Sequence, residues 1–382
     1  MKDLYPFLNQ ARQAGLYRRR RVLDSPQQPR LVVDGRPMLS FCSNDYLGLA
    51  ADERVAEAFR QGVERWGSGS GAAHLVTGHS RAHHALEEEL ADFTGRERAL
   101  LFSSGYLANL AVITSLCGRG DTVIQDRLDH ASLIDGARLG GAALKRYAHN
   151  DMAAVEQRLA AATGETLLAV DGVFSMDGDL ADLPALAALC QTHDAWLMVD
   201  DAHGLGVLGE EGRGSLARYG LDADRVPVLM GTLGKAFGTA GAFVAGSEAL
   251  IETLIQKARS YIFTTALPAA VAEATRASLK ILRQEDGRRE RLRALVARFR
   301  QGARQLGFEL PPSETPIQPL IAGEARTALD WSRALEEQGV LVTPIRPPTV
   351  PEGSARLRIT FSAAHALEDV DELLHALEVI AP

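Results

Sequence analysis

The sequence predicts an α/β protein, with a large, mostly parallel sheet domain and a small α+β domain. Two observations carry this prediction. Between residues 99 and 245, short apolar runs bounded by Asp or Gly alternate with helix-like stretches, as parallel βα units require. After about residue 266 the pattern changes to a charged helical stretch, 270–306, and a Pro-rich passage, 311–319. The 382 residues leave room for two or three structural units.

The first 45 residues contain a basic helical stretch and two short strands, RLVVDG and RPMLSFCS. This segment is too short to form a domain alone, and we expect it to pack with the C-terminal part of the chain. The boundaries predicted in this way give a segment 1–45, a large domain 46–280 and a small domain 281–382.

The strands predicted in the large domain are the apolar runs 99–102, 122–125, 166–170, 195–199, 228–231 and 242–245. These runs are apolar without interruption, as expected for strands of a parallel sheet, because both faces of such a sheet are buried. Helices are expected at 106–116 and 183–194, among others. The uncharged stretch 99–118 is long enough to cross a membrane, but its polar residues and its SSG turn predict a strand followed by a helix. We expect no membrane partner.

The tail predicts the elements of a small α+β domain. The strands expected there are 317–321, 340–345 and 356–360, and the helices are 326–338 and 367–380.

Charge and cysteine content exclude several classes of protein. The chain has 41 Lys and Arg against 49 Asp and Glu, a net charge of −8, which argues against nucleic acid as the main partner. The three cysteines are too few and too widely spaced for a disulfide framework or a CxxC metal site. Because the N-terminus also lacks a secretory signal, we expect a cytoplasmic protein.

Polar side chains follow four of the predicted strands, where ligands of parallel sheets gather. These residues are Asp126 and His130, Asp171 and Ser175, Asp200, Asp201 and His203, and Thr232 and Lys235. Taken singly, a strand-end Asp usually caps a helix and a lone Lys is usually solvated. Together, an acid, imidazoles, a hydroxyl and a lysine flanked by glycines predict a site that can hold an aldehyde cofactor as a Schiff base.

Histidines at 74, 79, 83 and 84 are the other group of possible metal ligands. His79 and His83 are spaced one helical turn apart, but no motif supplies a third and a fourth ligand. We expect no metal.

Seven segments of the chain resemble the α-oxoamine synthases, pyridoxal-phosphate enzymes of fold type I, which is the aspartate aminotransferase fold. They are FCSNDYLGLA (41–50), ALEEELADFTG (85–95), LFSSGYLAN (101–109), LDHASLIDGARL (128–139), DGVFSMDGDLADL (171–183), VDDAHGLGVLGEEGRG (199–214) and GTLGKAFGTAGAF (231–243). The resemblance implies an acyltransferase that uses pyridoxal 5′-phosphate.

Within this family, the segments look most like the members that join a pimeloyl thioester to L-alanine, with loss of carbon dioxide, in biotin biosynthesis. The resemblance leaves two alternatives open. A glycine-using member of the family, such as a 2-amino-3-ketobutyrate ligase or a 5-aminolevulinate synthase, would carry the same core. An inactive acyl-carrier-binding module could also have kept the fold.

The resemblance also implies a role for each cofactor residue. Lys235 forms the Schiff base and then acts as a base, Asp200 pairs with the pyridine nitrogen, and His130 stacks on the ring and lies near substrate. His203 and Ser175 bond to the phenolic oxygen or to atoms near it. The phosphate is held by Thr232 and by the main-chain amides of Gly105 and Tyr106, at a helix N-terminus. Asp171 is given no direct role.

For the substrates and the partner subunit, the resemblance implies a further set of residues. Arg358 binds the amino acid carboxylate, with Asn44 nearby, although Arg356 lies on the same face of an ideal strand and spacing cannot choose between the two. Arg18 and Thr349 match positions near the acyl substrate, whose carrier is coenzyme A or acyl carrier protein. The family forms homodimers, in which Thr264 and Thr265 reach the partner's cofactor phosphate.

Overall fold

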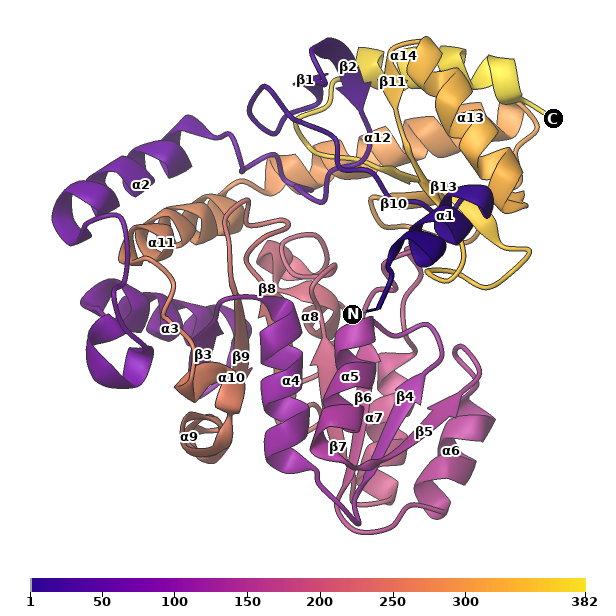
Figure 1. The fold of residues 1–382 in the computed structure, drawn as a ribbon. Helices are drawn as coiled ribbons and strands as arrows, with labels where there is room; N and C mark the ends of the chain where they lie inside the picture. The colour runs from indigo at the N-terminus through magenta and orange to yellow at the C-terminus, as the bar shows by residue number, and fades with distance from the viewer. Residues whose placement is uncertain (1) are drawn as a thin grey trace. The chain divides into compact units, whose positions relative to one another are not determined.

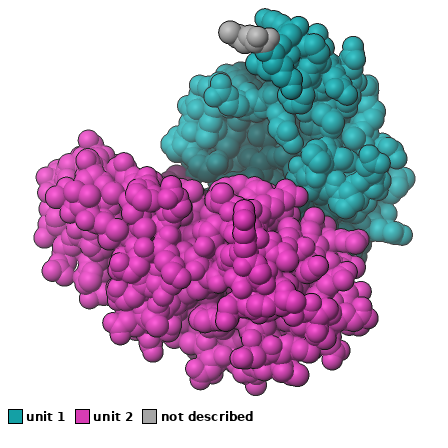
Figure 2. All heavy atoms as spheres, turned by 60° about the horizontal axis from the view of Figure 1, so that its bottom comes forward, with its two compact units in different colours: residues 1–46, 176–178, 290–382 teal, residues 47–175, 179–289 magenta. Residues whose placement is uncertain are grey.

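The computed structural model describes residues 2–382 and divides the chain into two compact units. The large unit, magenta in Figure 2, comprises Leu47–Ser175 and Asp179–Arg289. The small unit, teal in Figure 2, comprises the residues up to Tyr46, then Met176–Gly178 and Glu290–Pro382. The small unit is therefore assembled from three separate parts of the chain.

A seven-stranded sheet forms the centre of the large unit, in the order β3-β9-β8-β7-β6-β4-β5 (Figure 1). The strands are β3 (Arg98–Phe102), β4 (Thr122–Asp126), β5 (Ala143–Tyr147), β6 (Thr166–Asp171), β7 (Trp196–Asp200), β8 (Val228–Thr232) and β9 (Ala242–Gly246). Only β9 runs antiparallel to its neighbours, β3 and β8, and all other pairs are parallel. The prediction of a large, mostly parallel sheet is confirmed.

All six predicted strands of this sheet are present, but β5 was not predicted. Its sequence, ALKRY, alternates exposed and less exposed positions and carries Lys145 and Arg146. The strand pairs only with β4, at the edge of the sheet. An edge strand is partly open to solvent, so it lacks the continuous apolar run on which the prediction rested.

Helices cover both faces of the sheet. One apolar cluster joins the sheet to α4 (Gly105–Leu116), α5 (Ala131–Gly140), α9 (Glu248–Lys257) and α10 (Arg259–Ile262). The cluster on the opposite face includes α6 (Met152–Ala160), α7 (Leu183–Thr192) and α8 (Gly214–Tyr219). The uncharged stretch 99–118 forms β3, a turn and α4, as predicted. Within residues 2–382, no helix has the length and apolar character needed to cross a membrane.

Three further helices pack together at the β3 end of the large unit: α2 (Glu53–Trp66), α3 (Arg81–Thr94) and α11 (Ala269–Gln284). A Cβ atom on Gly62 of α2 would lie 2.8 Å from Cα of Ala270, so glycine is required where α2 meets α11. A π-helical turn, η1 (His74–Gly78), precedes α3, and a 3₁₀ turn, η2 (Glu210–Gly212), precedes α8. The predicted helical stretch 270–306 is divided at Glu285, whose backbone is not helical, into α11 and α12 (Asp286–Gln305).

The small unit contains two three-stranded sheets. The first joins β1 (Arg30–Val33) and β2 (Arg36–Ser40) to β11 (Val340–Leu341), and the second has β13 (Ala355–Thr360) between β10 (Ile317–Gly323) and β12 (Thr343–Ile345). Its remaining elements are α1 (Tyr5–Gln13), most of α12, α13 (Ala325–Glu337), α14 (Leu367–Leu377) and η3 (Glu378–Ile380). Because β2 pairs with β11, the N-terminal segment and the C-terminal part of the chain share one sheet.

An ion-pair network ties three connections of the large sheet together. His149, which follows β5, lies with Nδ1 3.2 Å from Asp126 at the end of β4 and with Nε2 2.7 Å from Asp179 after β6. Asp126 is fully buried. Burial lowers the pKa of His149, but its hydrogen bonds to Asp126 and Asp179 outweigh that effect and raise the pKa to about 10.

We expect His149→Gln to lower the free energy of unfolding by about 1–3 kcal/mol at pH 6, because it leaves a buried carboxylate without its cation. A raised histidine pKa stabilises the fold fully below the unfolded value of about 6.5. The advantage of the wild type should therefore shrink as the pH rises toward about 10. Urea unfolding across this range measures it, with His84→Gln on the exposed face of α3 as control. A difference that grows with pH would contradict the assignment.

Candidate active site

A pocket of about 210 Å³ lies in the large unit, at the carboxyl ends of the strands. Eight residues predicted from the sequence to bind a cofactor line it: Gly105, Tyr106, His130, Ser175, Asp200, His203, Thr232 and Lys235. Four further residues complete the lining: Asn109, Asp171, Ala202 and Met230.

Parallel strand ends bring these groups together. β6 ends at Asp171, β7 at Asp200 and β8 at Thr232. Asp171 and Asp200 are direct register partners, so their side chains leave adjacent strands at the same level. Both are almost completely buried.

The turn between β3 and α4 offers an anion site. Ser104 is the N-cap of α4, and its Oγ accepts a hydrogen bond from the main-chain N–H of Leu107. The N–H groups of Gly105 and Tyr106, in the first turn of α4, have no acceptor within the helix. They lie at the positive end of a 12-residue helix that borders the pocket, a position suited to a phosphate.

Two donors hold the Asp200 carboxylate in place. The main-chain N–H of Ala202 donates to Oδ1 at 3.0 Å, and Nδ2 of Asn109 donates to Oδ2 at 2.7 Å. Asn109 lies one turn into α4, so the helix that offers main-chain N–H groups to the pocket also orients its carboxylate.

Ser132, which also contacts Asn109, fixes the tautomer of His130. Nδ2 of Asn109 donates to Oγ of Ser132 at 2.8 Å, and that oxygen lies 2.7 Å from Nδ1 of His130. The main-chain N–H of Ser132 donates to the same Nδ1 at 3.3 Å. Nδ1 is then an acceptor and Nε2 carries the hydrogen. Burial lowers the pKa of His130, which keeps the ring neutral.

Lys235 follows β8 in a tight turn, in which the main-chain N–H of Gly238 donates to the Lys235 carbonyl. Its Nζ is 2.9 Å from Nε2 of His203. Thr232, at the end of β8, directs its hydroxyl to the carbonyl of Gly241 at 3.2 Å and also lines the pocket.

The loop that carries His203 is held by Asp201, a fully buried carboxyl that does not line the pocket. Asp201 Oδ2 accepts the main-chain N–H of Ser215 at 2.8 Å. Burial raises the pKa of Asp201 to about 7. A Cβ atom on Gly204 would come within 2.1 Å of Asp201 Oδ1, so glycine is needed where the loop crosses this carboxyl.

The substrate residues expected from the resemblance belong to the small unit. Arg358 donates from Nη2 to Oδ1 of Asn44 at 3.1 Å, while Arg356 forms an ion pair with Asp177. Both arginines are buried on the central strand β13. Thr349 lies exposed in the loop after β12.

Arg18 is exposed in the small unit. It borders a hollow of about 840 Å³ formed with Arg12, Tyr17 and the rest of the run up to Val22.

Thr264 and Thr265 lie between α10 and α11, and neither lines the pocket of their own chain. Thr265 forms an isolated bridge with Ala73. The roles implied for them therefore stay predictions.

The histidine group is closer to a metal site than the sequence indicated, since nitrogens of His74, His79 and His83 lie within 4.8 Å of one another. His83, however, uses both ring nitrogens: Nδ1 accepts the main-chain N–H of Ser80 at 3.0 Å, and Nε2 lies 2.7 Å from the carbonyl of Leu267. Coordination would break these hydrogen bonds. The absence of a metal stays a prediction.

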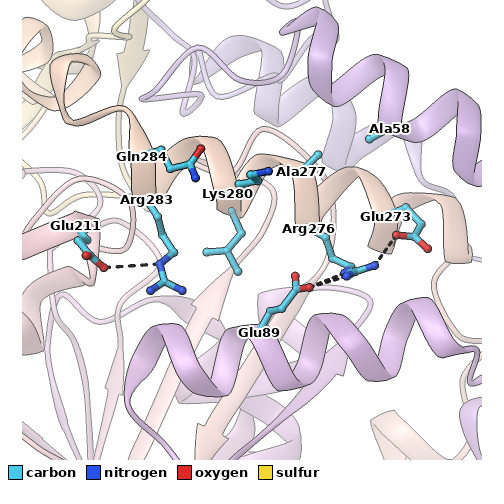
Figure 3. A pocket seen from close by; sticks show the side chains of 10 residues that line it. Ala58, Glu89, Glu211, Glu273, Arg276, Ala277, Lys280, Arg283 and Gln284 are labelled. Atoms are coloured by element: carbon cyan, nitrogen blue, oxygen red, sulfur yellow. Dashed lines mark hydrogen bonds and ion pairs between the residues drawn. The ribbon is translucent and has the colours of Figure 1, made fainter.

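Another hollow, of about 670 Å³, lies against α11 (Figure 3). Arg276 points to Glu89 and Glu273, at 2.6 and 2.8 Å, and Arg283 points to Glu211 at 3.6 Å. These arginines are already paired with carboxylates, which makes the hollow a poorer anion site than the α4 terminus.

The pocket at the strand ends fits pyridoxal 5′-phosphate. It has main-chain N–H groups for a phosphate, an amine for an aldehyde, a carboxylate for a protonated ring nitrogen and an imidazole for a ring face.

Sequence reasoning missed Asn109. Helical spacing could have found it, because it lies four residues after Gly105 and so on the same face of α4.

Residues 36–377 match the family model "Aminotransferase class I and II". The 8-amino-7-oxononanoate synthase of Thioalkalivibrio sulfidiphilus is 64% identical over 380 residues, covering 99% of this chain and 97% of the relative. That of Methylococcus capsulatus is 64% identical over 367 residues, covering 96% and 95%.

Among solved structures, serine palmitoyltransferase of Sphingomonas wittichii has a TM-score of 0.94 at 32% identity, covering 99% of this chain and 98% of the other. The enzyme from S. paucimobilis, with bound pyridoxal phosphate and myriocin, has a TM-score of 0.93 at 30% identity, covering 98% and 96%. An 8-amino-7-oxononanoate synthase from Francisella tularensis has a TM-score of 0.78 at 31% identity, covering 90% and 97%. The predicted fold type is confirmed.

We expect Asn109→Ala to weaken pyridoxal phosphate binding by about 10- to 100-fold, because the Asp200 carboxylate and Ser132 each lose a hydrogen bond. Equilibrium dialysis with fluorescence detection of the cofactor measures the dissociation constant. Thr114→Ala is the matched control, since the hydroxyl of this α4 residue donates to the carbonyl of Leu110 within the same helix. Equal affinity in Asn109→Ala and the wild type would show that Asp200 does not depend on Asn109.

Proposed function

Because the chain belongs to the class I and II aminotransferase family and, within it, to the 8-amino-7-oxononanoate synthases, we propose that it condenses L-alanine with a pimeloyl thioester. The products are 8-amino-7-oxononanoate, carbon dioxide and the free carrier, in biotin biosynthesis. The single observation that carries the proposal from the structural side is the meeting of Lys235, Asp200 and His130 in one pocket.

Bound pyridoxal phosphate supplies an aldehyde that bonds to amines and a protonated ring that accepts the electron pair released at the α-carbon of the amino acid. The residues of the chain bind and orient it. We propose that the amides of Gly105 and Tyr106, with Thr232, hold the phosphate, and that Asp200 holds the proton on the ring nitrogen. His130 covers one face of the ring and borders the substrate.

Lys235 is the proposed base for the α-proton of alanine. A lysine can accept a proton only when its amine is neutral, and Nε2 of His203, 2.9 Å away, is placed to exchange a hydrogen bond with Nζ. In this proposal His203 and Ser175 also bond to the phenolic oxygen of the cofactor.

For the carboxylate of alanine, we propose Arg358 with Asn44. Arg356 is ion-paired with Asp177, so a substrate carboxylate would have to compete with an existing partner there. The guanidinium of Arg358 contacts the neutral amide of Asn44, which can turn when a carboxylate binds.

The thioester carrier is coenzyme A or acyl carrier protein, with Arg18 and Thr349 near the acyl chain in this proposal. We propose a cytoplasmic homodimer in which Thr264 and Thr265 act on the partner's pocket. The three cysteines are unpaired, as expected in a reducing compartment.

We predict that the purified protein releases carbon dioxide and forms 8-amino-7-oxononanoate from L-alanine and a pimeloyl thioester, as measured by mass spectrometry. Pimeloyl-CoA and pimeloyl acyl carrier protein are tested separately. Lys235→Ala should form no product, because it lacks the amine that binds the aldehyde and moves the proton. Turnover with glycine but not alanine would favour the glycine-using alternative, and no turnover with either would favour the inactive module.

Borohydride treatment of the cofactor-loaded wild type, followed by peptide mapping, provides the control for this experiment. The pyridoxyl group should be found on Lys235. A label on any other lysine would contradict the assignment of the base.

Arg358→Lys keeps the positive charge but loses the two-pronged contact with a carboxylate. We expect alanine binding to weaken by about 5- to 150-fold, or about 1–3 kcal/mol, while cofactor binding stays the same. Titration of alanine against the absorbance of the bound cofactor measures both. Unchanged alanine affinity would move the contact to Arg356 or Arg18, and loss of cofactor would show that Arg358 serves the phosphate instead.

A further inference from the structure

Asp171 is a buried carboxyl of the pocket for which the proposed reaction has no role. It ends β6, is 3% exposed, and lines the same pocket as Asp200. Its Oδ2 accepts the main-chain N–H of His130 at 3.2 Å. Its Oδ1 is buried and has no hydrogen-bond partner in the described structure.

The position of Asp171 creates a charge problem. It is the register partner of Asp200, so the two Cα atoms lie about 4.8 Å apart on adjacent strands and both side chains enter one pocket. Two carboxylates so close together cannot both ionise readily. Other groups face Asp171 from the elements packed around it: Asp129 after β4, His130 at the start of α5, Tyr147 of β5 and Lys235 after β8.

The hydrogen bonds indicate which of the two carboxyls carries a proton. Asp200 receives a donor on each oxygen, from Ala202 and Asn109, so both of its oxygens already act as acceptors. Asp171 receives a donor only on Oδ2, and its own main-chain N–H donates to Asp129. Burial, followed by the charges of Asp200 and Asp129, raises the pKa of Asp171 well above its usual range.

We propose that Asp171 is a protonated positioning residue: Oδ2 holds the main chain of His130, and the hydroxyl on Oδ1 donates to the Asp200 carboxylate. A neutral Asp171 leaves Asp200 as the only anion of the pair. By contacting both Asp200 and the main chain of His130, Asp171 also fixes the position of the carboxylate relative to the imidazole of His130. The inference rests on the proposed function only in that the pocket binds pyridoxal phosphate.

The first test compares Asp171→Asn with Asp171→Ala in the cofactor-loaded protein. An amide keeps both contacts, so the cofactor dissociation constant of Asp171→Asn should stay within about threefold of wild type. The alanine variant should bind about 10- to 100-fold more weakly, since a hydrogen bond to a charged group is lost. Equal weakening in both variants would overturn the proposal, because it would show that an ionised Asp171 is required.

A purely structural role of Asp171 would give the same order of affinities in the two variants. Two further measurements therefore distinguish a structural role from the proposed protonated one. The infrared difference spectrum of wild type minus Asp171→Asn should contain a protonated-carboxyl band at neutral pH, and its absence would overturn the proposal. In an Asp200→Asn background, Asp171→Ala should cost at least tenfold less cofactor affinity than in the wild type, and an unchanged cost would also overturn it. If Asp171→Ala fails to fold, the infrared band and the Asp171→Asn affinity decide.

Neither measurement requires turnover, so the outcome can be told apart from failure of the proposed reaction. That failure would appear as missing product or as a label on a lysine other than Lys235.

Discussion

The parallel alignment of β6, β7 and β8 is the constraint on which the pocket depends. Their carboxyl ends lie at one edge of the sheet, so Asp171, Asp200 and Thr232 are delivered to the same place by backbone hydrogen bonding alone. The position of Lys235 follows, because it is only the third residue after the end of β8. The sheet thus determines where these residues lie, and side-chain contacts then determine how their side chains are oriented.

Asn109 makes the most important of these orienting contacts. One amide group contacts both Ser132 and Asp200, so the orientation of His130 and that of the carboxylate are coupled through a single side chain of α4. The same helix presents its N-terminus to the pocket. A displacement of α4 would therefore disturb its own N-terminus at the pocket, the imidazole of His130 and the carboxylate of Asp200 together.

Much of this arrangement could be predicted from the sequence, because buried parallel strands are continuous apolar runs and their polar ends are visible as single residues. β5 escaped prediction because an edge strand such as ALKRY keeps polar residues. Asn109 escaped because its importance lies in contacts with residues 23 and 91 positions away, which no local pattern records. Spacing placed Arg356 and Arg358 on one face. Their contacts differ, because Arg356 is ion-paired with Asp177 and Arg358 donates to the amide of Asn44.

The discontinuous small unit has a consequence for synthesis of the chain on the ribosome. Cys42, just after β2, contacts the carbonyl of Leu341, 299 positions later, and β2 pairs with β11 there. At about 5–20 residues per second, the N-terminal hairpin waits about 15–60 s for its partner strand. During that time the edge of β2 is unpaired, and the apolar side chains of Leu31, Val33 and Met38 lack their final cover. The nascent chain thus exposes an apolar hairpin with an open strand edge while the large unit is being made, and such an edge can pair with strands of other chains.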